Sequence, residues 1–114
     1  MAGSVLGELS VRQLRAHRRR LAAALEDLEG TLRGALLREG RRCSSAGCRC
    51  RRGELHGPYT YLAVYRAGRS RTVYVPSAVA AIAAERVEVT QRNEALLAEI
   101  SQVNLELLRR RALE

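Results

Sequence analysis

Residues 59–76 read YTYLAVYRAGRSRTVYVP, and this stretch decides the architecture that we expect. Two runs rich in tyrosine and β-branched residues flank a turn signal, AGRS, with Gly68 at its bend. Within the first run, tyrosines alternate with smaller or aliphatic side chains, as they do in a strand with two different faces. The pattern predicts a two-stranded β-hairpin over residues 59–75.

The tyrosines of this hairpin allow two interpretations. Tyr59, Tyr61 and Tyr65 are interleaved with arginines, and such rings can stack on unpaired nucleobases. The chain contains no phenylalanine and no tryptophan, so the same rings are also the large side chains available to close a small core. We expect them in the core.

The segment before the hairpin holds all three cysteines and one of the two histidines. Cys43, Cys48, Cys50 and His56 follow the spacing C-x4-C-x-C-x5-H, and three thiolates with one imidazole form the complement of a closed tetrahedral zinc site. Zinc is therefore the candidate cofactor. In the alternative interpretation the thiols are free or buried, and His56 orients the turn that follows it. An odd number of cysteines in a reducing compartment argues against a structural disulfide.

Positive charge is concentrated in the middle of the chain. The net charge is +8 and all 20 basic residues are arginine, but residues 41–76 hold eight of these arginines against one acid, Glu54. Codon bias can explain abundant arginine but does not explain this scarcity of acids, so we expect an anionic partner. The arginines predicted to contact nucleic acid are Arg41, Arg42, Arg49, Arg51, Arg52, Arg66, Arg69 and Arg71.

The N-terminal third is predicted to be a helix. Ser10 and Gln13 have the spacing of a capping box, and apolar residues follow in heptad steps, which predicts a helix over residues 10–39. Gly30 and Gly34 would each weaken this helix by about 1 kcal/mol relative to alanine, and we interpret them as the mark of a close helix crossing.

The C-terminal third predicts a second helix, over residues 77–111, with Ser77 as its N-cap. Its apolar stripe includes a polar residue, Asn93, which either fixes register and oligomer state, as in coiled coils, or lies at a wet edge of the stripe. We predict that oligomerisation uses Asn93, Leu96, Ile100, Val103 and Leu107.

Together these elements predict a mainly α fold with a small β-hairpin, in a single domain over residues 1–114. The order is helix, Cys/His- and Arg-rich segment over residues 41–58, two-stranded hairpin and long helix. Helices of this length are expected to fold back as an antiparallel helical hairpin that forms a homodimer through coiled-coil-like packing.

Several short motifs succeed one another in the middle of the chain. They are Cys43, Cys48-Arg49-Cys50, Gly53-Glu54, His56-Gly57-Pro58-Tyr59 and Arg71-Thr72-Val73-Tyr74-Val75-Pro76. The series resembles an uncharacterised small prokaryotic domain family whose typical stretch is C-G-K-x-x-C-x-C, then H-G-P-Y-Y, then R-x-x-Y-[IV]-P before a long helix. The resemblance covers roughly residues 38–107 and implies that the three cysteines and His56 act together, but it implies no reaction. This chain has Ser44 where the family usually has glycine, and Thr60 where an aromatic residue is usual.

The favoured function is a nucleic-acid-binding accessory protein that grips phosphates with its Arg-rich segment and hairpin, with DNA preferred over RNA. The alternatives are a coiled-coil adaptor that docks on a larger protein partner, and a thiol-based redox sensor. Catalysis is not expected, because the sequence lacks an acidic cluster, a Gly-rich phosphate loop and a second histidine with usable spacing. The chain has no signal-peptide core and no long apolar run, so we expect a cytoplasmic protein without membrane contact.

Overall fold

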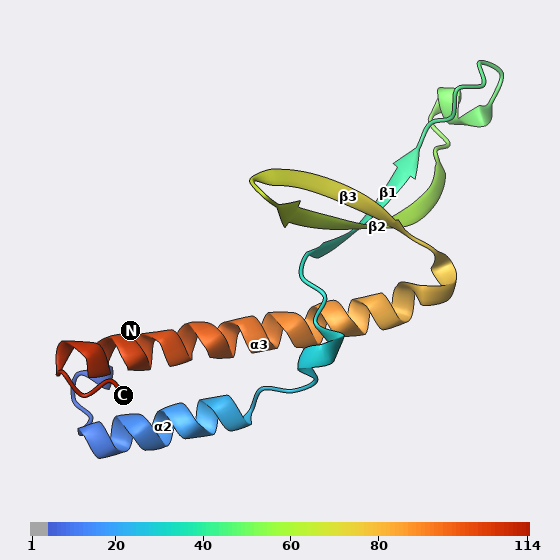
Figure 1. Cartoon of the computed structure of the whole chain (residues 1–114). Coiled ribbons are helices and arrows are strands. Elements are labelled where there is room, and N and C mark those ends of the chain that lie inside the picture. Colours follow the sequence, from blue (N-terminus) through green and yellow to red (C-terminus); the bar gives the residue numbers. More distant parts are fainter. Residues whose placement is uncertain (1–4) are drawn as a thin grey trace. The chain divides into compact units, whose positions relative to one another are not determined.

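The computed structural model describes residues 5–114, which form two compact units (Figure 1). Unit 1 comprises the described residues up to 29 together with residues 89–114, and unit 2 comprises residues 30–88. Helix α3, Ser77–Arg109, contributes its first residues to unit 2 and the remainder to unit 1. Each unit has its own hydrophobic core.

Unit 1 contains helix α2, Val11–Ala23. Its start has the predicted capping box: the Gln13 backbone N–H donates to Ser10 Oγ at 3.1 Å, and the Ser10 backbone N–H donates to Gln13 Oε1 at 2.8 Å. These two bonds satisfy backbone donors that have no partner within the first turn of a helix. The predicted N-terminus of this helix is therefore confirmed.

The core of unit 1 forms between α2 and the C-terminal half of α3. Leu14 and Leu21 of α2 pack with Val103 and Leu107 of α3, and Leu14 and Leu107 are fully buried. Leu96 and Ile100, which are partly buried, pack against the same cluster. The apolar residues predicted for oligomerisation thus fill an intramolecular core, and packing within one chain accounts for their pattern.

Asn93 is also occupied within one chain. Only 4% of the residue is exposed; its Nδ2 donates to the Glu26 carbonyl at 2.7 Å, and its Oδ1 accepts from the Glu26 backbone N–H at 3.1 Å. A buried amide side chain is stabilised by such paired bonds, which here hold the segment that follows α2. Asn93 therefore lies neither at a coiled-coil register position nor at a wet edge of the apolar stripe, which were the two predicted environments.

Unit 2 is built on a three-stranded antiparallel sheet in the order β1-β2-β3 (Figure 1). The strands are β1, Ala35–Arg41; β2, His56–Arg66; and β3, Arg69–Val75. The predicted mainly α fold with a two-stranded hairpin is therefore wrong: β2 and β3 pair as expected, but β1 adds a third strand along the other edge of β2. The predicted dimer of helical hairpins is likewise not supported.

The first helix ends at Ala23 instead of continuing to residue 39. A short 3-10 turn, Leu28–Gly30, follows, and Gly34 leads into β1. Both glycines lie beyond the end of this helix, so neither marks a crossing of it, and Gly34 has φ = +144°, a conformation that side-chain-bearing residues rarely adopt. Pairing of β1 with β2 then satisfies backbone groups of residues that have good helix propensity.

We expect Gly34→Ala to lower the free energy of unfolding by roughly 1–3 kcal/mol. A Cβ at this position would lie 2.6 Å from the Ala63 carbonyl oxygen, a backbone atom that cannot turn away as a side chain can. Urea denaturation measures the loss. Gly47→Ala is the matched control, because a Cβ at Gly47 meets nothing within 4 Å; equal losses in the two variants would contradict the close approach of β1 and β2.

The two faces of the sheet differ. Leu62 of β2, Val75 of β3 and Val87 of α3 form a buried cluster. Partly buried aliphatic side chains pack against this cluster. The tyrosines expected in the core, Tyr59, Tyr61 and Tyr65, instead lie on the opposite face, where Tyr65 is 77% exposed, Tyr59 is 37% exposed and Tyr61 is half-buried. Alternation along β2 places Leu62 and the tyrosines on opposite sides, and the aliphatic residues alone suffice to cover the helix.

Candidate metal centre

The candidate ligands lie around the loop that joins β1 to β2. Arg41 pairs with His56 at the base of this loop, so the two antiparallel strands bring Cys43 close to His56 although twelve residues separate them. Within the loop, a 3-10 helix η2, Arg49–Arg52, carries Cys50, with Cys48 at its N-cap. Gly53 ends η2 with φ = +102°, which returns the chain toward β2.

The four side chains converge on one point. Their ligand atoms all lie within 4.8 Å of one another, with Cys43 Sγ 3.6 Å from Cys50 Sγ and Cys48 Sγ 3.1 Å from His56 Nε2. For a Zn–S distance of about 2.3 Å, a tetrahedral site has an S···S edge of about 3.8 Å. The residues predicted as ligands are thus close enough to hold a metal ion.

The surroundings lower the pKa of the Cys50 thiol but raise that of Cys43. The Cys43 backbone N–H donates to Cys50 Sγ at 3.3 Å and lowers the pKa of the Cys50 thiol, an effect that burial opposes and the charge of Arg51 reinforces. Cys50 is fully buried, whereas the other three ligands are half-buried. Donor sets of three thiolates and one imidazole are typical of closed structural sites that leave no position open for substrate.

The arginines predicted to bind nucleic acid all lie in unit 2, and all are exposed. Five lie in or next to the loop that joins β1 to β2: Arg41 ends β1, Arg42 follows it, and Arg49, Arg51 and Arg52 lie on η2. The other three lie at the β2–β3 turn, where Arg66 pairs with Arg69 and Arg71 pairs with Val64.

Two of the loop arginines make contacts within the loop. Arg51 Nη2 donates to the Cys43 carbonyl at 3.0 Å, and Arg49 lies 3.8 Å from the Glu54 carboxylate. Both side chains of this ion pair are largely exposed, so it holds Arg49 only weakly. Unit 2 carries eleven arginines against four acids, and unit 1 carries nine against eight, so nearly all of the net charge belongs to unit 2.

Sequence reasoning missed a second group, in which Arg41 meets the tyrosine side of the sheet. The Arg41 guanidinium lies 4.3 Å from the Tyr61 ring centroid, and its Nε donates to Tyr61 Oη at 3.1 Å. Tyr74 packs against both Tyr59 and Tyr61. Strand alternation already placed Tyr59 and Tyr61 on one side, but Arg41 joins them only because β1 is a strand.

Fold and site define a small α+β protein with a candidate metal centre of three cysteines and one histidine. The chain belongs to DUF6788, a domain of unknown function, whose family model matches residues 11–84. The match includes α2, all three strands and the four candidate ligands. No curated protein and no solved structure matches the chain.

Among residues 5–114, no helix is a candidate for a membrane span. None of the helices in this range has the combination of length and hydropathy that crossing a bilayer requires.

Proposed function

We propose that this protein is a nucleic-acid-binding module in which a zinc ion holds an arginine-rich loop in shape. The observation that carries the proposal is the convergence of Cys43, Cys48, Cys50 and His56 at the base of a loop whose arginines are all exposed. A zinc ion held by these ligands would tie both ends of the loop to its middle, and the arginines between them are exposed.

The role proposed for zinc is structural. Bound zinc would supply a rigid tetrahedral crosslink, and four protein ligands leave it no position at which to activate water. The core of unit 2 is small, with Leu62, Val75 and Val87 as its buried apolar residues, so such a crosslink would add stability that this unit otherwise lacks. The site requires reduced thiols, which fits a cytoplasmic protein.

The role proposed for the arginines is contact with phosphates. Guanidinium groups match phosphate oxygens with two parallel hydrogen bonds, and an ordered loop loses less entropy on binding than a flexible one. Arg51 illustrates the ordering, because one of its nitrogens already contacts the Cys43 carbonyl. The concentration of net charge in unit 2 would steer a polyanion to the same unit.

Salt dependence tests this proposal. Neutralisation of six to eight phosphates on a duplex gives a slope of about −5 to −7 in a plot of log affinity against log salt. We expect Arg52→Ala to weaken binding at every sequence tested and to reduce that slope by about 0.9, since one phosphate contact is lost. Fluorescence anisotropy over a salt series measures both quantities.

Arg12→Ala is the matched control, because Arg12 is an exposed arginine on α2 in unit 1. Equal effects of Arg52→Ala and Arg12→Ala would show that charge alone, without the loop, governs binding. A protein with bound metal that binds neither DNA nor RNA near physiological salt would refute the proposal. Binding to a larger protein partner in that case would favour the adaptor alternative.

A further inference from the structure

We propose that the tyrosine face of the sheet stacks unpaired bases, so that the ligand is single-stranded nucleic acid. The tyrosine face is defined as Tyr59, Tyr61 and Tyr74 together with Arg41. This inference rests on the proposed function and adds the class of nucleic acid that the same unit binds.

The rings form one connected cluster that remains open to solvent. Tyr74 lies 6.3 Å from Tyr59 and 5.9 Å from Tyr61 between ring centroids, with interplanar angles of 75° and 63°. In such edge-to-face pairs, one ring contributes only its edge, so its own faces are not covered by its neighbour. Tyr59 is 37% exposed and Tyr74 is 53% exposed, which leaves aromatic surface for a stacking partner.

A β-bulge adds a cation to this face. The register of β1 with β2 shifts between Glu39 and Arg41, and bulges of this kind redirect the side chain that follows. Gly40 lies at the shift, where a Cβ would come within 2.7 Å of Leu55 Cβ, so only glycine fits the close approach. The Arg41 guanidinium thereby lies over the Tyr61 ring. Its Nη2 also forms an ion pair with Glu39 Oε2 at 3.5 Å.

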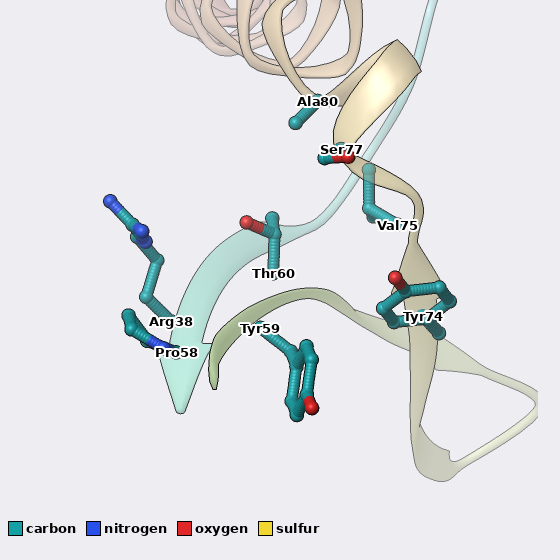
Figure 2. A pocket seen from close by; sticks show the side chains of 8 residues that line it. All are labelled: Arg38, Pro58, Tyr59, Thr60, Tyr74, Val75, Ser77 and Ala80. Atoms are coloured by element: carbon teal, nitrogen blue, oxygen red, sulfur yellow. The ribbon is translucent and has the colours of Figure 1, made fainter. Parts of the chain in front are cut away.

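Tyr59 and Tyr74 also line a cleft of about 290 Å³ beside the junction of β3 with α3 (Figure 2). Arg38 of β1 lies at the side of this cleft opposite Tyr74, and Thr60 lies between them (Figure 2). Two aromatic rings and a guanidinium along one cleft are complementary to a nucleotide, whose base stacks and whose phosphate is anionic.

The exposed rings favour single strands over a duplex. In a duplex the base faces are already stacked on one another, so aromatic side chains can reach them only where the strand is unpaired. Phosphate contacts by arginines serve both forms of nucleic acid and do not distinguish them. The tyrosine face therefore adds affinity that a duplex cannot use.

The test compares binding of the full, metal-loaded chain to oligothymidylate and oligouridylate of roughly 16 nucleotides with binding to a duplex of the same length. We expect tighter binding to at least one of the single strands than to the duplex. Tyr74→Leu, which keeps apolar bulk but removes the ring, should weaken single-strand binding about tenfold or more and leave duplex binding unchanged. Tyr74→Phe should restore single-strand binding, because it keeps the ring and loses only the hydroxyl.

The variants also separate the two proposals. Equal affinity for single strands and duplex, with no effect of Tyr74→Leu on either, would overturn the stacking inference and leave phosphate binding by the loop intact. Absence of binding to any of the three probes would overturn both. Circular dichroism and metal content of Tyr74→Leu exclude unfolding as the reason for a loss, since Tyr74 is half exposed and is not a ligand.

Discussion

Cys50→Ser and His56→Ala are each expected to abolish stoichiometric metal binding. Each change removes one of four converging ligands, and loss of a direct ligand should reduce metal affinity by more than the roughly 10- to 100-fold that loss of an outer-shell contact costs. Because metal-binding free energy is also folding free energy, we expect the β1–β2 loop to become susceptible to proteolysis after Arg49, Arg51 and Arg52. Elemental analysis of protein purified without chelator and limited trypsin digestion measure the two effects.

His17→Ala is the matched control for this prediction. His17 is the other histidine of the chain and lies on α2 in unit 1, so its removal should leave metal content and loop protection unchanged. If His17→Ala lost as much metal as His56→Ala, the ligand set proposed here would be wrong. Retention of full metal content by Cys50→Ser would contradict it equally.

Leu107→Ala is expected to lower the free energy of unfolding by about 2–5 kcal/mol. Leu107 is fully buried in the core of unit 1 and packs with Leu14 and Leu21 of α2, so its truncation leaves a cavity between two elements of one chain. Urea denaturation at several protein concentrations measures the change. Because the packing is intramolecular, the unfolding midpoint should not depend on protein concentration.

Leu108→Ala makes the same chemical change one residue further along α3, where the side chain is 55% exposed. We expect this control to lose less than about 1 kcal/mol, since exposed positions of a helix tolerate alanine. A midpoint for Leu107→Ala that rises with protein concentration would indicate a subunit interface instead of an intramolecular core.

Local features of the fold were predictable from the sequence. The capping box of Ser10 and Gln13 depends on residues three apart, and the β2–β3 pairing depends on strand runs that flank a short turn. The convergence of Cys43, Cys48, Cys50 and His56 was predicted from spacing alone, because all four occur within one short segment.

Strand β1 could not be predicted from local preference. Its residues, ALLREGR, favour a helix when considered alone, and they also continue the apolar heptad pattern of α2. The strand forms because long-range pairing, such as that of Leu36 with Leu62, outweighs local propensity. Gly34, with φ = +144°, is a local signal of the change, and its interpretation as a helix crossing is wrong.

The exposure of the tyrosines could not be predicted either, because it depends on the unpredicted strand β1 and on the packing of α3 against the sheet. Alternation in β2 separates Leu62 from Tyr61, but it does not say which of the two faces packs on α3. The small residues Ala80 and Ala83 of α3 accept aliphatic partners, so Leu62 takes the inner face and the rings remain outside.

The most direct measurement is the metal content of untagged protein purified without chelator, combined with thiol titration before and after metal removal. About one zinc per chain, with all three thiols unreactive until chelation, is the result expected if Cys43, Cys48, Cys50 and His56 hold a structural ion. Protein without metal, in which three thiols react freely from the start, would contradict the metal-held loop on which the proposed function depends.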